Sequence, residues 1–380
     1  MDKPLKIRLH VLSPIHIGCD DVYEPTSFVI DTDKKKLVSF DPLAFIRTLT
    51  DRERQELTAI AQKGTLPSII EIYRFIFNKR SSIKGNEISI SQGIIDRYIS
   101  VKSLALNDRN IKQELNNFII PRTAYHPYNN TPYIPGSSLK GSVRTGFLSM
   151  LALGGGTYKG LDYILAGNKP NNSITNRRNA RELELQLLEG SFAEDPFRML
   201  KVSDLLPHTN VRTRVLYAIN RRKLDGSKQT RGIPQIFEII EAGSSFEGVI
   251  NLQSPPSSAG IKKPIDSLGI RAFFRAVHKH YARNYGVESK IAEQLHFKMP
   301  RPLKSHGDMK ETAFLIRVGK HSGAESVTIE GNRQILVRGP RGSKEIKDHA
   351  TTIWLASEQA KPENNNGLFP FGWAVMEVLN

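Results

Sequence analysis

The sequence of 380 residues contains a single cysteine, Cys19. One cysteine excludes an internal disulfide and a zinc site built from several thiolates, and it favours a reducing compartment. No run of about 18 apolar residues is long enough to cross a membrane, and the first residues lack the apolar core of a secretory signal peptide. The motifs H-E-x-x-H and G-x-S-x-G, and an evident nucleophile with its base, are also missing. These absences predict a cytosolic protein without a membrane partner, metal or cofactor.

Acidic residues are few relative to basic ones: 38 Asp and Glu stand against 54 Lys and Arg, which gives a net charge of +16. Such an excess attracts polyanions. The alternatives are a basic surface without a ligand, or a patch for an acidic protein or a membrane. Because the positive residues recur in separate segments rather than in one amphipathic helix, we expect nucleic acid as the partner.

Strand and helix patterns are interspersed, which predicts an α+β fold of antiparallel sheets covered by helices. Residues 5–11 alternate as a half-buried strand. Hairpins are expected around residues 32–35 and around the turn "AGSS" within residues 234–252. Asp41 caps an expected helix. Further strands are expected in residues 312–323, 326–331, 334–339 and 372–378, and a helix in residues 267–286. Residues 51–118 read as a helical insertion, residues 154–180 as a mobile loop, and residues 253–264 as a linker. The expected domains are 1–253 and 254–380.

The stretch "YIPGSSLKGSVRTGFLSML", residues 133–151, predicts a helix whose start can hold an anion. The first N–H groups of a helix lack intrahelical partners, and Lys140 and Arg144 lie one turn apart beside them. An ordinary capped helix is the alternative. However, Gly141 and Gly146 inside the helix cost roughly 1 kcal/mol each, which favours a partner packed against them. In the phosphate loop of nucleotide hydrolases, G-x-x-x-x-G-K-[ST], the lysine follows the second glycine, whereas Lys140 precedes Gly141. The segment is therefore not expected to hydrolyse nucleotides. The expected phosphate contacts are Gly136, Ser137, Ser138, Lys140, Gly141 and Arg144.

Two other segments carry positive charge in a suitable setting. The strand over residues 211–222 places Arg212 and Arg214 on one face, which suits a sheet that follows a phosphate backbone or is merely a solvated face. Lys320, His321 and Ser322 lie between two glycines directly after a strand. Such a loop can direct N–H groups at an anion, and an ordinary turn is the alternative.

Signals of catalysis are sparse. His16 is a candidate general acid or base, and Asp20 with Asp21 is a candidate metal site, although adjacent carboxylates in a loop are commonly turn or surface residues.

Several of these blocks together resemble a known family. "LSPIHIG", "YIPGSSLKGSVRTGFL", "FRMLKVSD" followed by "EIIEAGSSFEG", then "FLIRVGKHSG" and "PFGW" resemble, in this order, the RAMP proteins of CRISPR effector complexes. Order and spacing are most similar to the fifth Csm subunit of type III-A systems. The resemblance spans most of the chain apart from the helical insertion and the 154–190 segment.

The resemblance implies a pair of ferredoxin-like, RRM-type domains in a subunit that has no catalytic centre of its own. Such a subunit holds the 3′ portion of CRISPR RNA, caps the backbone filament beside the adjacent RAMP subunit, and assists maturation of the RNA end in antiviral defence. The implied RNA contacts are the helix start named above, the loop around His16 and Gly18, and the "GKHSG" loop. Target RNA is a further candidate partner. The alternative is a RAMP ribonuclease that uses Asp20 and Asp21, or His16.

Overall fold

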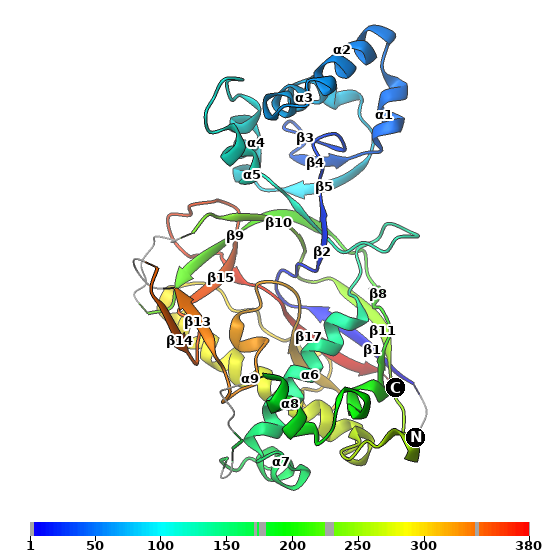
Figure 1. Ribbon diagram of the computed structural model, residues 1–380, viewed down its shortest axis with the longest axis vertical. Helices are drawn as coiled ribbons and strands as arrows, with labels where there is room; N and C mark the ends of the chain where they lie inside the picture. Colours follow the sequence, from blue (N-terminus) through cyan, green and yellow to red (C-terminus); the bar gives the residue numbers. More distant parts are fainter. Residues whose placement is uncertain (1–3, 171–172, 175–179, 225–231, 339–341, 380) are drawn as a thin grey trace.

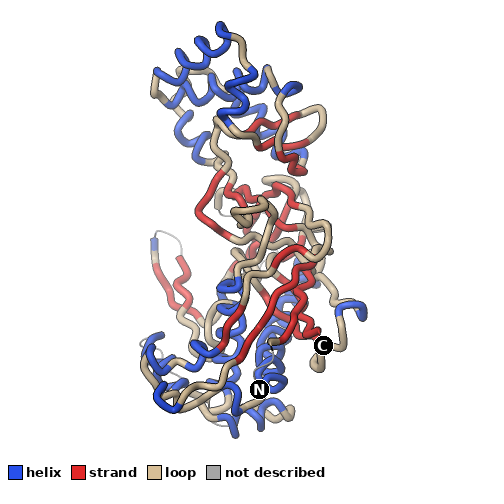
Figure 2. The backbone as a smooth tube through the Cα atoms, turned by 90° about the vertical axis from the view of Figure 1, so that its right-hand side faces the viewer, coloured by secondary structure: helices blue, strands red, loops and turns tan. Residues whose placement is uncertain are grey.

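The computed structural model describes residues 4–170, 173–174, 180–224, 232–338 and 342–379. Figure 1 shows a larger body that holds both ends of the described chain and a smaller lobe that stands on it. Turned by 90°, the molecule is elongated along the line that joins these two parts (Figure 2). No described helix combines the length and apolar character that a membrane span requires.

An antiparallel sheet of six strands forms the centre of the body. Its order is β12-β17-β1-β11-β7, with β8 paired to β11. The helices α6 and α9 pack together and cover this sheet, and the largest apolar core lies between them and the strands. The bounds are β1 Leu5–Val11, β7 Leu200–Val202, β8 Leu206–Pro207, β11 Ser245–Leu252, β12 Ala313–Arg317, β17 Trp373–Leu379, α6 Gly136–Leu153 and α9 Ile270–Leu295.

A second sheet, of seven strands, runs from the body into the lobe. Its order is β16-β15-β9-β5-β4-β3, with β10 on β9. All its pairs are antiparallel except β5 with β9. The bounds are β3 Phe28–Asp31, β4 Lys36–Ser39, β5 Asn86–Ile90, β9 Thr213–Arg222, β10 Gln235–Ile240, β15 Thr352–Ser357 and β16 Phe369–Pro370.

Helices cover the sheet inside the lobe. They are α1 Pro42–Thr48, α2 Asp51–Gln62, α3 Leu66–Asn78, α4 Gln92–Lys102 and α5 Ile111–Asn116. Asp41 caps α1 as predicted, because its carboxylate accepts from the N–H groups of Leu43 and Ala44. The remaining elements are β2 Gly18–Val22, paired with β6 Pro121–Thr123; β13 Ile335–Arg338, paired with β14 Lys344–Lys347; and the helices α7 Tyr158–Leu165 and α8 Ala180–Leu188.

The predicted α+β class with antiparallel sheets is confirmed, as are the strand at residues 5–11 and the hairpin of β3 and β4. Each large sheet contains strands from both sides of residue 253. The division into domains 1–253 and 254–380, and the ferredoxin-like arrangement of each, stay predictions.

Four local predictions are wrong. Residues 235–252 form no hairpin, because the turn "AGSS" carries the chain from one sheet to the other. The predicted insertion 51–118 contains β5, which pairs with β4 and β9. No strand forms at residues 326–331. The helix expected to end at residue 286 continues to Leu295.

The segment predicted as a mobile loop, residues 154–180, contains the helix α7. Residues 171–172 and 175–179 of that segment lie outside the described residues.

Candidate nucleic-acid interface

The start of α6 is held against the end of β7. A Cβ atom on Gly136 would lie 2.3 Å from the backbone oxygen of Val202, so only glycine fits there. The Gly136 N–H donates to the Asp204 carboxylate at 2.8 Å. Neither Ser137 nor Ser138 caps the helix with its side chain, so the alternative of an ordinary helix capped by a serine is wrong. Asp204 already satisfies one of the free donors on which an anion would depend.

The next turn of α6 is open to solvent. Ser137 and Gly141 are exposed, and nothing lies within 4 Å of the place that a Cβ on Gly141 would take. Gly146 is different: its Cβ would lie 3.2 Å from Val277 and Tyr281, so it serves the packing of α6 on α9. Of the two glycines that suggested a bound partner, Gly141 alone leaves room for one.

Lys140 extends from this open turn. It makes no hydrogen bond or ion pair with the described residues. Partial burial, together with the nearby charge of Lys201, lowers the pKa of Lys140, while Asp195 acts in the opposite direction. Two cations that stand close together in this way attract a multiply charged anion.

Arg144 is neutralised inside the protein. Its guanidinium is 2.7 Å from both Glu184 and Asp195, and it lies 4.8 Å over the ring of Phe197. Two carboxylates therefore surround one cation. The sequence placed Arg144 on RNA phosphate, but the structure gives it a local role that the sequence did not indicate, because both carboxylates lie 40 or more residues away in the chain.

The structure brings the loop around His16 against the "GKHSG" loop. The Lys320 N–H donates to the His16 backbone oxygen at 2.9 Å. Gly319 has φ +86°, and a Cβ there would lie 2.6 Å from the same oxygen. The ring of Phe237 contacts both imidazoles, with centroids 4.6 Å from His16 and 4.9 Å from His321. Two segments that share no sequence pattern thus form one cluster.

His16 is neutral in this cluster. Burial lowers its pKa to about 4, against an opposing hydrogen bond from its Nδ1 to the Glu238 backbone oxygen at 2.7 Å. The neutral ring donates from Nδ1, which leaves Nε2 as a hydrogen-bond acceptor. Burial likewise lowers the pKa of His321 to about 3. A neutral acceptor repels phosphate oxygens, so neither imidazole is suited to pair with the RNA backbone as a cation.

Of the other predicted contacts in this cluster, one is buried and two are exposed. Ser322 is buried, and its hydroxyl donates to the Gly319 backbone oxygen at 2.5 Å. Gly18 begins β2 and is exposed. Lys320 is exposed, with its ammonium 4.8 Å over the Phe237 ring. Only Lys320 presents a charge to solvent here.

The strand β9 lacks the basic face that its alternation predicted. Leu216 and Ala218 occupy that face and pack in an apolar cluster with Phe237 and Phe371. Arg214 lies 2.7 Å from Glu358. Arg212, whose side chain is 78% exposed, lies before the strand and 3.6 Å from Glu241. The prediction of a continuous basic face is wrong, because both sides of the strand's centre are buried.

The carboxylates near the N-terminus do not converge. Asp20 is exposed with φ +58°, and Asp21 pairs with Arg122 at 3.0 Å. Across the described part of the chain, no group of three or more His, Cys, Asp or Glu side chains is arranged to hold a metal ion.

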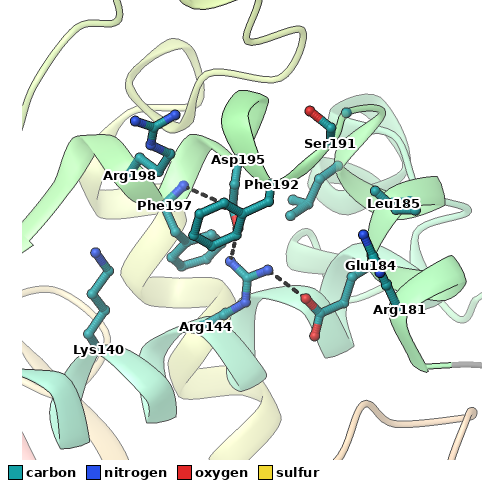
Figure 3. A pocket seen from close by; sticks show the side chains of 12 residues that line it. Lys140, Arg144, Arg181, Glu184, Leu185, Ser191, Phe192, Asp195, Phe197 and Arg198 are labelled. Carbon is teal, nitrogen blue, oxygen red and sulfur yellow. Dashed lines mark hydrogen bonds and ion pairs between the residues drawn. The ribbon is translucent and has the colours of Figure 1, made fainter.

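Sequence reasoning missed a pocket next to α6. A cavity of about 480 Å³ lies between α6, α8 and the segment 190–198. Figure 3 shows Phe192 in the middle of it, with Lys140 and Arg198 on one side and Glu184 with Arg181 on the other. The sequence indicates this pocket only weakly, through the phenylalanine Phe192, which stands among small and acidic residues in "GSFAEDPF".

Comparison with known proteins gives consistent matches. The family model of the RAMP superfamily matches residues 8–287. The CRISPR system Cms protein Csm5 of Methanocaldococcus jannaschii is 24% identical over 209 residues, which cover 53% of this chain and 43% of that protein. The match thus spans less than half of that relative's length.

Two solved structures share the fold over nearly the whole chain. A chain in the cryo-EM structure of a Csm-crRNA-target RNA ternary complex of a type III-A CRISPR-Cas system has a TM-score of 0.59 and 18% identity, covering 99% of this chain and 100% of its own. The crystal structure of T. onnurineus Csm5 has a TM-score of 0.55 and 15% identity, covering 97% and 99%. The predicted resemblance to RAMP proteins, and among them to the fifth Csm subunit, is confirmed.

Proposed function

Because this chain belongs to the RAMP superfamily, we propose that it is a non-catalytic subunit that binds CRISPR RNA in a type III-A Csm complex. The family match over residues 8–287 carries the proposal, since it includes the whole of α6 and the loop around His16. The fold shared with a chain of a Csm-crRNA-target RNA complex supports it. The net charge of +16 supplies attraction to any RNA.

We take the proposed role within the complex from the resemblance to the fifth Csm subunit. The subunit holds the 3′ portion of the CRISPR RNA, caps the filament next to the adjacent backbone RAMP subunit, and assists maturation of the 3′ end, in the cytoplasm. Target RNA is a second RNA partner in this proposal.

Within the proposed interface, the open turn of α6 makes the principal backbone contact. Ser137, Lys140 and Gly141 offer a hydroxyl, an ammonium and an unobstructed backbone at one place. Exposed Lys320, Arg212 and Gly18 extend the surface. Arg144, His16, His321 and Ser322 support these elements from inside instead of meeting the phosphate, because each is paired or buried.

Salt dependence of binding tests the backbone contact. For single-stranded RNA, log affinity should fall linearly with log salt, by about 0.7 per neutralised phosphate. Lys140→Ala should reduce that slope by about 0.7 and weaken all RNA sequences equally. Fluorescence anisotropy of the purified chain over a series of salt concentrations measures both.

Lys63→Ala is the matched control. Lys63 is a surface lysine of the lobe that pairs with Glu71 at 2.6 Å, so its removal should leave the slope unchanged. A wild-type slope near zero, or a loss on Lys140→Ala that depends on the base sequence, contradicts the proposal.

The non-catalytic part needs a separate assay. Labelled RNA incubated with the chain, with Mg²⁺ and with a chelator, should stay intact. Cleavage that disappears in Asp20→Ala or His16→Ala would establish the ribonuclease alternative instead.

A further inference from the structure

The pocket beside α6 presents an unusually exposed aromatic ring. Phe192 is 83% exposed although it carries no polar atom. Its backbone is fixed, because the Glu194 carboxylate accepts from the Ser191 N–H at 2.6 Å and closes a capping box around it. The backbone that carries the ring is therefore held in place at the mouth of a cavity. Exposed Leu185 and buried Leu188 and Phe197 complete an apolar lining.

Cations gather at one side of this pocket. Lys140 and Arg198 line it, and Lys201 acts on the pKa of Lys140 from nearby. Arg198 and Lys201 are exposed. The carboxylate that reaches this side, Asp195, is engaged by Arg144 and by the Phe197 N–H at 2.8 Å. A negative group from outside the chain would thus meet ammonium and guanidinium groups without competition from a free carboxylate.

Arg144 contributes a flat, fixed surface to the same cavity. Glu184 and Asp195 hold its guanidinium on both sides, with Phe197 at 4.8 Å from it. Planar guanidinium groups and aromatic rings are the surfaces on which proteins stack unpaired bases. The ion pairs that remove Arg144 from phosphate binding therefore make it part of a rigid stacking surface (Figure 3).

We propose that this pocket receives one unpaired nucleobase of the RNA, which stacks on Phe192, while the adjoining phosphate lies at Lys140 and Arg198. The inference rests on the proposed function, because Lys140 belongs both to the open turn of α6 and to the pocket wall. One strand can therefore pass from the backbone contact directly into the pocket. The volume of about 480 Å³ falls within the range of small-ligand sites.

An apolar side chain of a neighbouring protein is the competing occupant. The gathering of cations at the mouth and the continuity with the RNA surface favour a nucleotide over a peptide. The two occupants respond differently to changes at Phe192, because a leucine keeps apolar contact but loses the aromatic face.

A thermodynamic cycle tests the base contact. The purified full chain is titrated with an oligouridylate of about 12 nucleotides, within the usual range of single-strand sites, and with an abasic oligomer of the same length. Phe192→Ala should weaken binding of the oligouridylate by roughly 5- to 140-fold, the effect of losing one stacked base. It should leave binding of the abasic oligomer unchanged.

Three further variants sharpen the result. Phe192→Tyr should retain affinity, whereas Phe192→Leu should behave like Phe192→Ala. Val327→Ala, at an apolar side chain that is 64% exposed elsewhere, should have no effect on either oligomer. The salt slope should stay constant in Phe192→Ala and fall in Lys140→Ala, because only the lysine neutralises a phosphate.

The outcomes separate the two proposals. If the wild-type chain binds neither oligomer, the proposed function fails. If it binds RNA but Phe192→Ala binds both oligomers as wild type does, the pocket inference alone fails. If Phe192→Ala weakens binding of the oligouridylate but Phe192→Leu retains full affinity, the contact needs no aromatic face and the stacking inference is overturned.

Discussion

Two regions of this molecule have similar composition but differ in how deeply their side chains are buried. The open turn of α6 and the loop Arg317–Gly323 both combine glycine, serine and lysine at the end of an element. At α6 these residues face solvent around Lys140. In the loop, Arg317 and Ser322 turn inward and are 3% exposed. The difference teaches that burial decides which polar groups of a glycine-rich basic motif stay available, so we expect a ligand at the exposed groups and not at the buried ones.

The largest expected change in the free energy of unfolding comes from a substitution inside the loop, at Arg317. The Arg317 guanidinium donates to Glu288 at 2.5 Å and to the Phe371 backbone oxygen at 2.8 Å. Arg317→Ala would leave the Glu288 carboxylate buried without its cation, with a loss of about 3–5 kcal/mol in the free energy of unfolding. Urea denaturation measures this loss. Arg214→Ala, which breaks a more exposed pair with Glu358, should cost at most about 1 kcal/mol. If Arg317→Ala and Arg214→Ala lowered the free energy of unfolding equally, the distinction between the buried and the exposed arginine would be wrong.

An intermediate effect is expected from the neutral imidazole of His16, on how the free energy of unfolding depends on pH. Its pKa is about 4 in the folded protein, against 6.5 in an unfolded chain. Between these values the unfolded state binds more protons, so stability is complete above pH 6.5 and is lost as the pH falls toward 4. His16→Gln should reduce the loss between pH 7 and pH 4.5 by roughly 2 kcal/mol.

Urea titrations at both pH values measure that change. His278 and His321 titrate in the same direction, so part of the acid sensitivity should remain. An unchanged acid loss in His16→Gln would mean that the ring is solvated, and the contrast between the regions would weaken.

The smallest effect on stability is expected at the open turn. Lys140→Ala removes a side chain without a partner among the described residues, so the free energy of unfolding should change by less than about 0.5 kcal/mol. Thermal denaturation without RNA measures it. A loss of several kcal/mol would show that Lys140 supports the fold, and the assignment of this turn to ligand binding would fall.

Local signals in the sequence predicted local structure well. Alternation located β1, and Asp41 followed by Pro42 located the start of α1. The turn "AGSS" was recognised, but a turn signal does not state which strands pair, and β10 and β11 joined different sheets. The short strand β5 was hidden among helices because five residues carry too little periodicity to be told from a helical turn.

The candidate site was predicted only in part, for a similar reason. Lys140 and Gly141 share a helical turn, so their proximity follows from sequence spacing. The partners of Arg144 are Glu184 and Asp195, which lie 40 or more residues away in the chain. Contacts over such separations leave no local pattern in the sequence from which they could be predicted. The meeting of His16, Phe237 and His321 joins three segments that only the fold brings together.

The pairing of β1 with β17 has a consequence for biosynthesis. Ser13 and Trp373, which are hydrogen-bonded next to these strands, are 360 residues apart. At translation rates of about 5–20 residues per second, the ribosome needs roughly 20–70 s to produce the partner of β1. Throughout that time one apolar strand edge stays unpaired in the nascent chain, open to aggregation or to a chaperone. The sheet beneath α6 is therefore incomplete until β17 has been synthesised.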